Sequence, residues 1–259
     1  MAKILLGKPV AEEIYQSLKI EGHPTMVAIL IGEDPASLLY IKAKGKKAHE
    51  LGVAFKLFHL PGIASENTVI ELIKDLNKKE NINGIIVQLP LPESFDTEKI
   101  LQSVSSGKDI DGFFSVKFTP PTVLAIMEIL KYYHLELIGK KVAIVGYGRL
   151  VGKPLSQFLG NQGIKPFICT SNSDIVSETK DADIIISATG IPSLIKPEMV
   201  AGKAVIIDAG TAESRGKIRG DVDSKVYEKV SAYTPTPAGL GPVTVACLFR
   251  NLIEAARKS

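Results

Sequence analysis

The feature that most constrains this chain is a series of short, continuous runs of apolar and β-branched residues. The run Thr25–Gly32 reads TMVAILIG, and Val53–Leu60 and Gly84–Leu89 are similar. Such runs are typical of strands buried on both faces of a parallel sheet. Apolar residues recur at helical spacing through 69–76, after Ser65 as N-cap. The alternation of strands and helices predicts βαβ units and an α/β fold.

A second alternation follows an irregular segment. Ser103–Pro121 contains serines, two adjacent prolines and no periodicity, so we place the domain boundary near its end, followed by a helix at 122–134 with Thr122 as N-cap. A helix is expected from Pro154, and the further strands are expected at Lys141–Val145, Lys165–Thr170, Asp183–Ala188 and Ala204–Ala209. We therefore expect two α/β domains, at 1–120 and 121–242, with a last amphipathic helix at about 243–259 that returns to the first.

Composition narrows the class of function. The 259 residues carry a net charge of +3 without a basic block, which disfavours a nucleic-acid partner. Only Cys169 and Cys247 are present, so we expect no disulfide framework and no metal site. No apolar stretch approaches the length that spans a bilayer and the start lacks a signal-peptide pattern, so we expect a cytoplasmic protein without a membrane partner.

A glycine-rich turn marks a nucleotide site. In KKVAIVGYGRLVGKP, glycines stand directly after a strand and before a helix, where backbone N–H groups can approach a pyrophosphate. The spacing GxGxxxG is one residue longer than the usual dinucleotide pattern, so a simple tight turn remains an alternative. The expected cofactor contacts in this turn are Gly146, Tyr147, Gly148, Arg149, Val151 and Gly152.

The end of the next strand bears on the choice of cofactor. NAD enzymes often place an acidic residue there, but this chain continues Thr170-Ser171-Asn172 and has no carboxylate until Asp174. Arg149 and the hydroxyls of Thr170 and Ser171 suit a 2′-phosphate through charge-assisted hydrogen bonds. The residues favour NADP over NAD.

A lysine-rich helix at 36–51 offers a candidate catalytic group. Ser37, Tyr40 and Lys44 fall at i, i+3 and i+7, so one face carries all three. A solvated surface helix has the same pattern, and the spacing alone does not choose between these readings.

Five strings in order resemble the methylenetetrahydrofolate dehydrogenase/cyclohydrolase family. They span most of the chain and read IGEDPASLLYIKAK, GIIVQLPLP, KDIDGF, VGYGRLVGKP and TPTPAGLGPVT. The resemblance implies an N-terminal α/β catalytic domain that binds folate, a Rossmann-like NADP-binding domain, an active-site cleft between them and a homodimer. It also implies two reactions: oxidation of 5,10-methylenetetrahydrofolate to the methenyl form with NADP, and hydrolysis of that form to 10-formyltetrahydrofolate.

The resemblance assigns roles residue by residue. Lys44 would shuttle protons during hydrolysis, which needs a lowered pKa, and Gln88 would orient it. Asp111 would accept hydrogen bonds from the pterin ring, although an Asp before Gly112 is also common in turns. Tyr40 would pack on the folate and place its hydroxyl near Lys44.

Further residues are expected to line the two ligands. Ser37 is a candidate folate contact, but a helical serine often bonds only backbone. The other folate contacts would be Leu89, Pro90, Pro237, Gly239, Gly241 and Pro242. Thr189 and Gly190 would approach the nicotinamide, and Asp208 is expected to be structural.

One departure and three alternatives stay open. Many family members read GRS after the first nucleotide strand, whereas this chain has Tyr147-Gly148-Arg149, with the positive charge displaced. One alternative is a monofunctional NAD-dependent methylenetetrahydrofolate dehydrogenase, against which Lys44 and Gln88 argue. A second alternative is a shikimate-type dehydrogenase, but the substrate-binding strings of such enzymes are absent from this sequence. A non-catalytic folate or nucleotide binder would retain the lysine and glutamine for structure alone.

Overall fold

The computed structural model describes residues 2–214 and 217–257. The chain divides into two compact units. One unit contains the residues up to Gln16 and Pro120–Cys247, and the other contains Ser17–Thr119 and the chain from Leu248 onward. We call them the nucleotide unit and the lysine unit, after the glycine-rich turn and Lys44.

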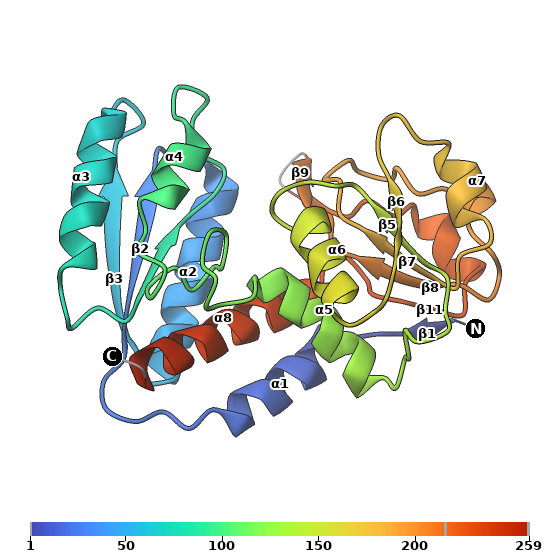
Figure 1. The fold of residues 1–259 in the computed structure, drawn as a ribbon, viewed down its shortest axis with the longest axis horizontal. Helices are drawn as coiled ribbons and strands as arrows, with labels where there is room; N and C mark the ends of the chain where they lie inside the picture. The colour runs from blue at the N-terminus through green and yellow to red at the C-terminus, as the bar shows by residue number, and fades with distance from the viewer. Residues whose placement is uncertain (1, 215–216, 258–259) are drawn as a thin grey trace. The chain divides into compact units, whose positions relative to one another are not determined.

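The lysine unit is built on a parallel three-stranded sheet in the order β3-β2-β4 (Figure 1). Its strands are β2 (Thr25–Ile31), β3 (Ala54–Leu60) and β4 (Gly84–Val87). Its helices are α2 (Pro35–Glu50), α3 (Glu66–Asn77), α4 (Thr97–Gln102) and the part of α8 (Leu240–Arg257) that begins at Leu248. All seven residues of β2 are buried, as expected for a central strand covered on both faces.

Local sequence explains where these helices begin. Asp34 caps α2, since its carboxylate accepts a hydrogen bond from the Ser37 amide, and Pro35 is tolerated in the first turn. Ser65 caps α3 by accepting from the Thr68 amide, as the sequence predicted. Val69, Ile73 and other apolar residues of α3 then pack in one cluster with alternate residues of β2.

The nucleotide unit contains a six-stranded parallel sheet in the order β1-β11-β8-β7-β5-β6. Its strands are β1 (Lys3–Ile4), β5 (Val142–Val145), β6 (Phe167–Cys169), β7 (Ile184–Ser187), β8 (Val205–Asp208) and β11 (Ala232–Tyr233). A separate antiparallel pair comprises β9 (Ala212–Ser214) and β10 (Lys217–Arg219). The helical segments are α1 (Gly7–Ser17), α5 (Pro121–Tyr132), α6 (Gly152–Asn161), α7 (Ile175–Thr179), η1 (Pro197–Met199), η2 (Ser224–Glu228) and the start of α8.

The central strands of this sheet are buried on both faces. Successive residues of β5, such as Val142 and Ala143, belong to two different apolar clusters on opposite faces of the sheet. The chain therefore has the doubly wound parallel architecture of α/β proteins. The strand order reverses at β5, between β6 and β7, and in such sheets ligands bind beyond the carboxyl ends of the strands at this switch point.

The structure corrects three details of the sequence analysis. The first residues, expected in the domain 1–120, belong to the nucleotide unit because β1 pairs with β11. Helix α5 begins at Pro121 with Pro120 as N-cap and no side-chain bond, so the predicted cap at Thr122 is wrong. Helix α6 begins at Gly152 rather than Pro154. Among residues 2–214 and 217–257, no helix is long and apolar enough to cross a membrane.

Candidate active site

A lysine and a glutamine meet at the carboxyl end of the sheet in the lysine unit. Lys44, on α2, donates a hydrogen bond from Nζ to Oε1 of Gln88 at 3.0 Å. Gln88 directly follows β4, is 8% exposed and donates from Nε2 to the Leu89 carbonyl at 2.7 Å. The amide of Gln88 is thus held at both ends, with its oxygen directed at the Lys44 amine.

The ionisation of Lys44 reflects its surroundings. Its side chain keeps partial solvent exposure, but burial around the amine lowers the pKa of Lys44 below its ordinary value. The negative charge of Asp111 acts in the opposite direction and raises that pKa. Burial has the larger effect, so this amine loses its proton more readily than an exposed lysine does.

Asp111 is the charged counterpart of Lys44. Burial raises the pKa of the Asp111 carboxyl to about 6, while the charge of Lys44 lowers it and the charge of Asp109 raises it further. The two groups therefore influence each other's protonation without an ion pair between them among the described contacts.

A neighbouring carboxylate, Asp109, stabilises the loop that carries Asp111. Asp109 is 5% exposed, and its oxygens accept hydrogen bonds from the amides of Gly112, Phe114 and Ser115 at 2.8–3.1 Å. Burial raises the pKa of Asp109, and these hydrogen bonds partly offset that effect. The sequence did not reveal this role, because the string KDIDGF contains two aspartates and the family resemblance assigned a role only to the second.

The remaining folate-side candidates of this unit lie near the same strand end. Ser37 is 1% exposed, and its hydroxyl donates to the Leu89 carbonyl at 3.4 Å. A hydrogen bond to backbone was the alternative to a folate contact for this serine. Tyr40 stands one turn before Lys44 on α2 and is 36% exposed. Leu89 and Pro90 are joined by a cis peptide bond directly after Gln88.

In the nucleotide unit, the glycine-rich turn is closely packed at its first and last glycines. Gly146 has φ of 98°, and a Cβ there would lie 2.6 Å from the Ala188 carbonyl oxygen. A Cβ on Gly152 would lie 1.9 Å from the Gly146 carbonyl oxygen, so the start of α6 approaches the turn as only glycine permits. Around Gly148, by contrast, a Cβ would meet none of the other described residues within 4 Å. The turn thus leaves open backbone at Gly148 beside a helix N-terminus, which fits a dinucleotide pyrophosphate.

The residues expected around the ribose are exposed or bonded locally. Tyr147 is 45% exposed, and Arg149 is also exposed on the turn, with Val151 at the N-cap of α6. Ser171 is exposed, whereas the Thr170 hydroxyl accepts from the Asn172 amide at 3.4 Å.

Across the switch point, a buried carboxylate shapes the segment after β7. Asp221 is fully buried and its Oδ2 accepts from the Ser187 hydroxyl and the Thr189 amide, each at 2.7 Å. Its Oδ1 has no hydrogen-bond partner among the described residues. Gly190 follows with φ of 71°. Asp221 was not singled out from the sequence, since GDVD carries no spacing that distinguishes it.

Asp208 serves the same region as a structural acceptor. It ends β8, is 2% exposed and accepts from the amides of Gly210 and Asp221 at 3.2 and 3.1 Å. Burial raises the pKa of Asp208 to about 6, and the bond from the Asp221 amide opposes this shift.

The loop before α8 packs on the start of α1. The Gly7 amide donates to the Ala238 carbonyl at 2.9 Å, and a Cβ on Gly7 would lie 1.8 Å from the Gly239 carbonyl oxygen. Pro237 follows a cis peptide bond, whereas Gly241 and Pro242 lie in the first turn of α8. These candidate folate contacts therefore belong to the nucleotide unit.

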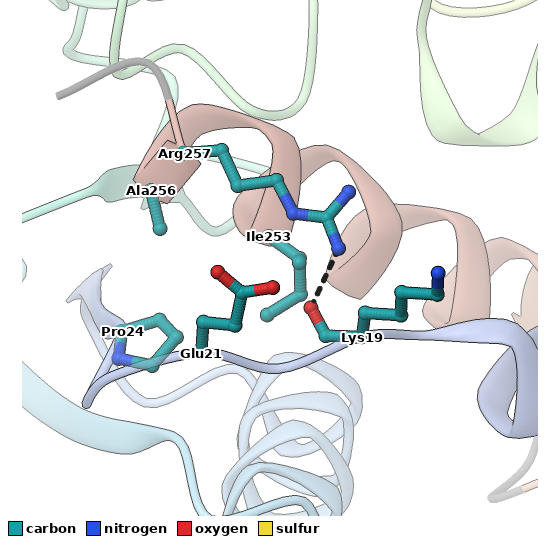
Figure 2. Close-up of a pocket in the computed structure, with 6 residues that line it drawn as sticks. All are labelled: Lys19, Glu21, Pro24, Ile253, Ala256 and Arg257. Carbon is teal, nitrogen blue, oxygen red and sulfur yellow. Dashed lines mark hydrogen bonds between the residues drawn. The ribbon is translucent and has the colours of Figure 1, made fainter.

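A pocket of about 650 Å³ in the lysine unit lies at the other end of its sheet from Gln88. Figure 2 shows its lining residues Lys19, Glu21, Pro24, Ile253, Ala256 and Arg257. Pro24 immediately precedes β2, which places the pocket at the amino ends of the strands, and Arg257 donates to the Lys19 carbonyl at 2.8 Å. This pocket is separate from the Lys44 site.

A doubly wound sheet with a glycine turn at its switch point is the arrangement of dinucleotide-dependent enzymes, and a desolvated lysine is suited to proton transfer. The comparisons specify this class further. The model of the tetrahydrofolate dehydrogenase/cyclohydrolase catalytic domain matches residues 5–111, and the model of the family's NAD(P)-binding domain matches residues 120–259. The chain belongs to the tetrahydrofolate dehydrogenase/cyclohydrolase family, and it is an enzyme with a dehydrogenase and a cyclohydrolase activity.

Individual relatives agree over the whole length. The chain is 39% identical to the bifunctional protein FolD of Aquifex aeolicus, with 100% of this chain and 96% of that protein covered. The crystal structure of the bifunctional FolD enzyme of Campylobacter jejuni superposes with a TM-score of 0.93 at 35% identity, covering 100% and 99% of the two chains. The Trypanosoma brucei enzyme complexed with NADP and an inhibitor gives a TM-score of 0.89 at 27% identity, covering 97% and 95%.

The mutual influence of Lys44 and Asp111 can be tested directly. Asp111→Asn removes the negative charge that raises the pKa of Lys44, so we expect that pKa to fall further. Conversely, Lys44→Met should raise the pKa of Asp111 above about 6. NMR titration of labelled Lys and Asp side chains measures both shifts. Asp75→Asn, on an exposed side chain of α3, is the control, and an Asp111→Asn variant in which Lys44 titrates as in the parent would contradict the coupling.

Proposed function

We propose that the enzyme oxidises 5,10-methylenetetrahydrofolate to 5,10-methenyltetrahydrofolate with NADP, and then hydrolyses the methenyl form to 10-formyltetrahydrofolate. The observation that carries the proposal is the hydrogen bond from the Lys44 amine to the buried Gln88 amide, at a site where burial lowers the pKa of Lys44. Membership of the family supplies the substrate class.

In the hydrolytic step, Lys44 acts as the proton shuttle. Its lowered pKa increases the fraction of neutral amine near neutral pH, and a neutral amine can accept a proton from water as the oxygen adds to the methenyl carbon. The resulting ammonium returns a proton to the ring nitrogen as the carbon–nitrogen bond breaks, and the hydroxyl group derived from water loses its remaining proton to solvent as the formyl carbonyl forms. Gln88 Oε1 accepts a hydrogen bond from the amine in both charge states, so the shuttle keeps its position through the cycle.

Asp111 anchors the pterin ring by accepting hydrogen bonds from its amino group and ring N–H. This role requires the ionised carboxylate, and with a pKa of about 6 Asp111 is mostly ionised at pH 7. Tyr40 packs on the folate close to Lys44. Ser37, Leu89 and Pro90 line the same site, with Ser37 already tied to backbone.

The nucleotide unit binds the cofactor, which accepts the hydride when bound. The open backbone at Gly148 and the N-terminus of α6 would hold the pyrophosphate, and Arg149 with Thr170 and Ser171 would hold the 2′-phosphate. Thr189 and Gly190 position the nicotinamide. The NADP complex of the Trypanosoma brucei relative supports this choice of cofactor.

The two binding functions are assigned to the two compact units, each of which contains two separate segments of the chain. Folate binding belongs mainly to Ser17–Thr119 with the chain from Leu248, and cofactor binding belongs to the nucleotide unit.

The functional assembly is a cytoplasmic homodimer. Among the described strands, β3 is the last at one edge of its sheet and carries Leu57 at 44% exposure, so it offers a surface for a second copy. Light scattering should give a mass of twice 27.9 kDa, and Leu57→Lys should shift the protein toward monomer. A monomeric parent protein at micromolar concentration would contradict the dimer.

The role of Lys44 is tested by Lys44→Met. Loss of the amine should reduce hydrolysis of the methenyl form by about 10²–10⁴-fold, the usual contribution of acid–base catalysis, while NADP binding is retained. Lys46→Met is the matched control, because Lys46 lies on the same helix with an 81% exposed side chain. Stopped-flow absorbance of the methenyl band measures the hydrolysis, and normal hydrolysis in Lys44→Met would remove the proposed mechanism.

The cofactor assignment is tested with 5,10-methylenetetrahydrofolate and either NADP or NAD. We expect reduction of NADP in preference to NAD with little accumulation of the methenyl form. Arg149→Ala should raise the KM for NADP about tenfold, since a charge-assisted hydrogen bond is lost, and leave the KM for NAD unchanged. Lys165→Ala, exposed and before the amino end of β6, is the control. Accumulation of the methenyl product would indicate the monofunctional enzyme, and no reduction of either cofactor would indicate a non-catalytic binder.

A further inference from the structure

Asn251, in the last part of α8, is a buried amide that bonds the loop carrying Asp111. It is 3% exposed, and its Nδ2 donates to the Ile110 carbonyl at 2.9 Å and to the Thr119 carbonyl at 3.0 Å. Both amide hydrogens are therefore used on backbone oxygens of one loop.

These two carbonyls stand at the two ends of the loop. Ile110 directly precedes Asp111, and Thr119 closes the irregular segment before α5. Inside the loop, the Asp109 carboxylate accepts from the amides of Gly112, Phe114 and Ser115. One side chain thus ties the ends of the loop together while another fixes its interior.

Close packing holds the helix against this loop. Leu252 and Ile110 approach the same glycine of β4, because a Cβ on Gly84 would lie 2.6 Å from Ile110 Cδ1 and 2.8 Å from Leu252 Cδ1. Ile110 is fully buried. The backbone on the amino side of Asp111 is therefore fixed by packing as well as by the bond from Asn251.

We propose that Asn251 is a positioning residue for folate binding: by clamping the Ile110 and Thr119 carbonyls, it sets the place from which the Asp111 carboxylate holds the pterin ring. This inference rests on the role given to Asp111 in the proposed function. Asn251 has no contact with substrate in this proposal and acts only through the loop.

The chemistry of the clamp requires an uncharged group with two donors. An asparagine amide meets two buried carbonyl oxygens with two N–H groups, whereas a leucine leaves both oxygens unpaired and an aspartate presents further acceptors to them. Lys44 and Gln88 come from α2 and the end of β4 and bond each other, so the clamp does not hold them. Its loss should therefore affect substrate binding more than turnover.

The test compares Asn251→Leu with Ile253→Ala in the full-length protein. Ile253 is 4% exposed on the same helix and lines the pocket at the amino end of the sheet, so its truncation weakens the core without touching the loop. We expect Asn251→Leu to raise the KM for 5,10-methylenetetrahydrofolate about tenfold, in proportion to two lost hydrogen bonds, with kcat nearly unchanged. Ile253→Ala should lower the melting temperature with a KM close to the parent value.

Two further measurements separate positioning from general destabilisation. The dissociation constant for NADP, measured by calorimetry, should be the same in all variants, because the cofactor residues belong to the nucleotide unit. Hydrogen exchange at the amides of Gly112, Phe114 and Ser115 should accelerate in Asn251→Leu and not in Ile253→Ala. Asn251→Ser retains one hydrogen-bond donor and replaces Asn251→Leu in the test if the leucine variant does not fold. Its KM for 5,10-methylenetetrahydrofolate should be higher than that of the parent, but by less than tenfold.

The outcomes distinguish this inference from the function on which it rests. A parent protein that does not turn over 5,10-methylenetetrahydrofolate would remove the proposed function itself. An active parent, with Asn251→Leu or Asn251→Ser showing the same KM as Ile253→Ala, would overturn the positioning role alone.

Discussion

The candidate active site in the lysine unit depends on the partial burial of one primary amine. Burial disfavours the charged form of Lys44, and a direct ion pair with a carboxylate would restore that form. The unit instead places a neutral amide, Gln88, against the amine and leaves Asp111 to act on it only through its charge. Because the amide oxygen accepts a hydrogen bond from either an amine or an ammonium, a proton can arrive or leave without breaking the contact.

Much of this arrangement was predictable from the sequence, for identifiable physical reasons. A strand buried on both faces needs a continuous apolar run, so β2 and β4 could be read directly. The same interpretation was wrong for β3, which lies at the end of its sheet and has no buried residue. Helical periodicity put Tyr40 and Lys44 on one face of α2. The contact between Lys44 and Gln88 was suggested only by the family resemblance, because spacing along a chain does not specify which side chains meet across a sheet end.

The remaining features of the fold and of the site could not be predicted, because contacts between residues far apart in the sequence determine them. Two-residue strands such as β1 have no periodicity, so the pairing of β1 with β11 that assigns the first residues to the nucleotide unit could not be foreseen. Asp109 and Asp111 are chemically identical, and only the backbone path determines that the first bonds the loop amides. Asn251 left a fainter signal: a polar residue between Leu248 and Leu252, in a helix whose neighbouring positions are buried.

The division of α8 between the two units has a consequence for how the protein is made. The lysine unit needs the chain from Leu248 onward, yet Pro120–Cys247 of the other unit is translated in between. Ribosomes add about 5–20 residues per second, and domains otherwise tend to fold as they emerge. Here the segment Ser17–Thr119 must wait, with the surface that the last part of α8 will cover still exposed, until the residues from Leu248 onward have been translated. Nascent chains of this protein should therefore present that uncovered surface to chaperones while Pro120–Cys247 is being translated.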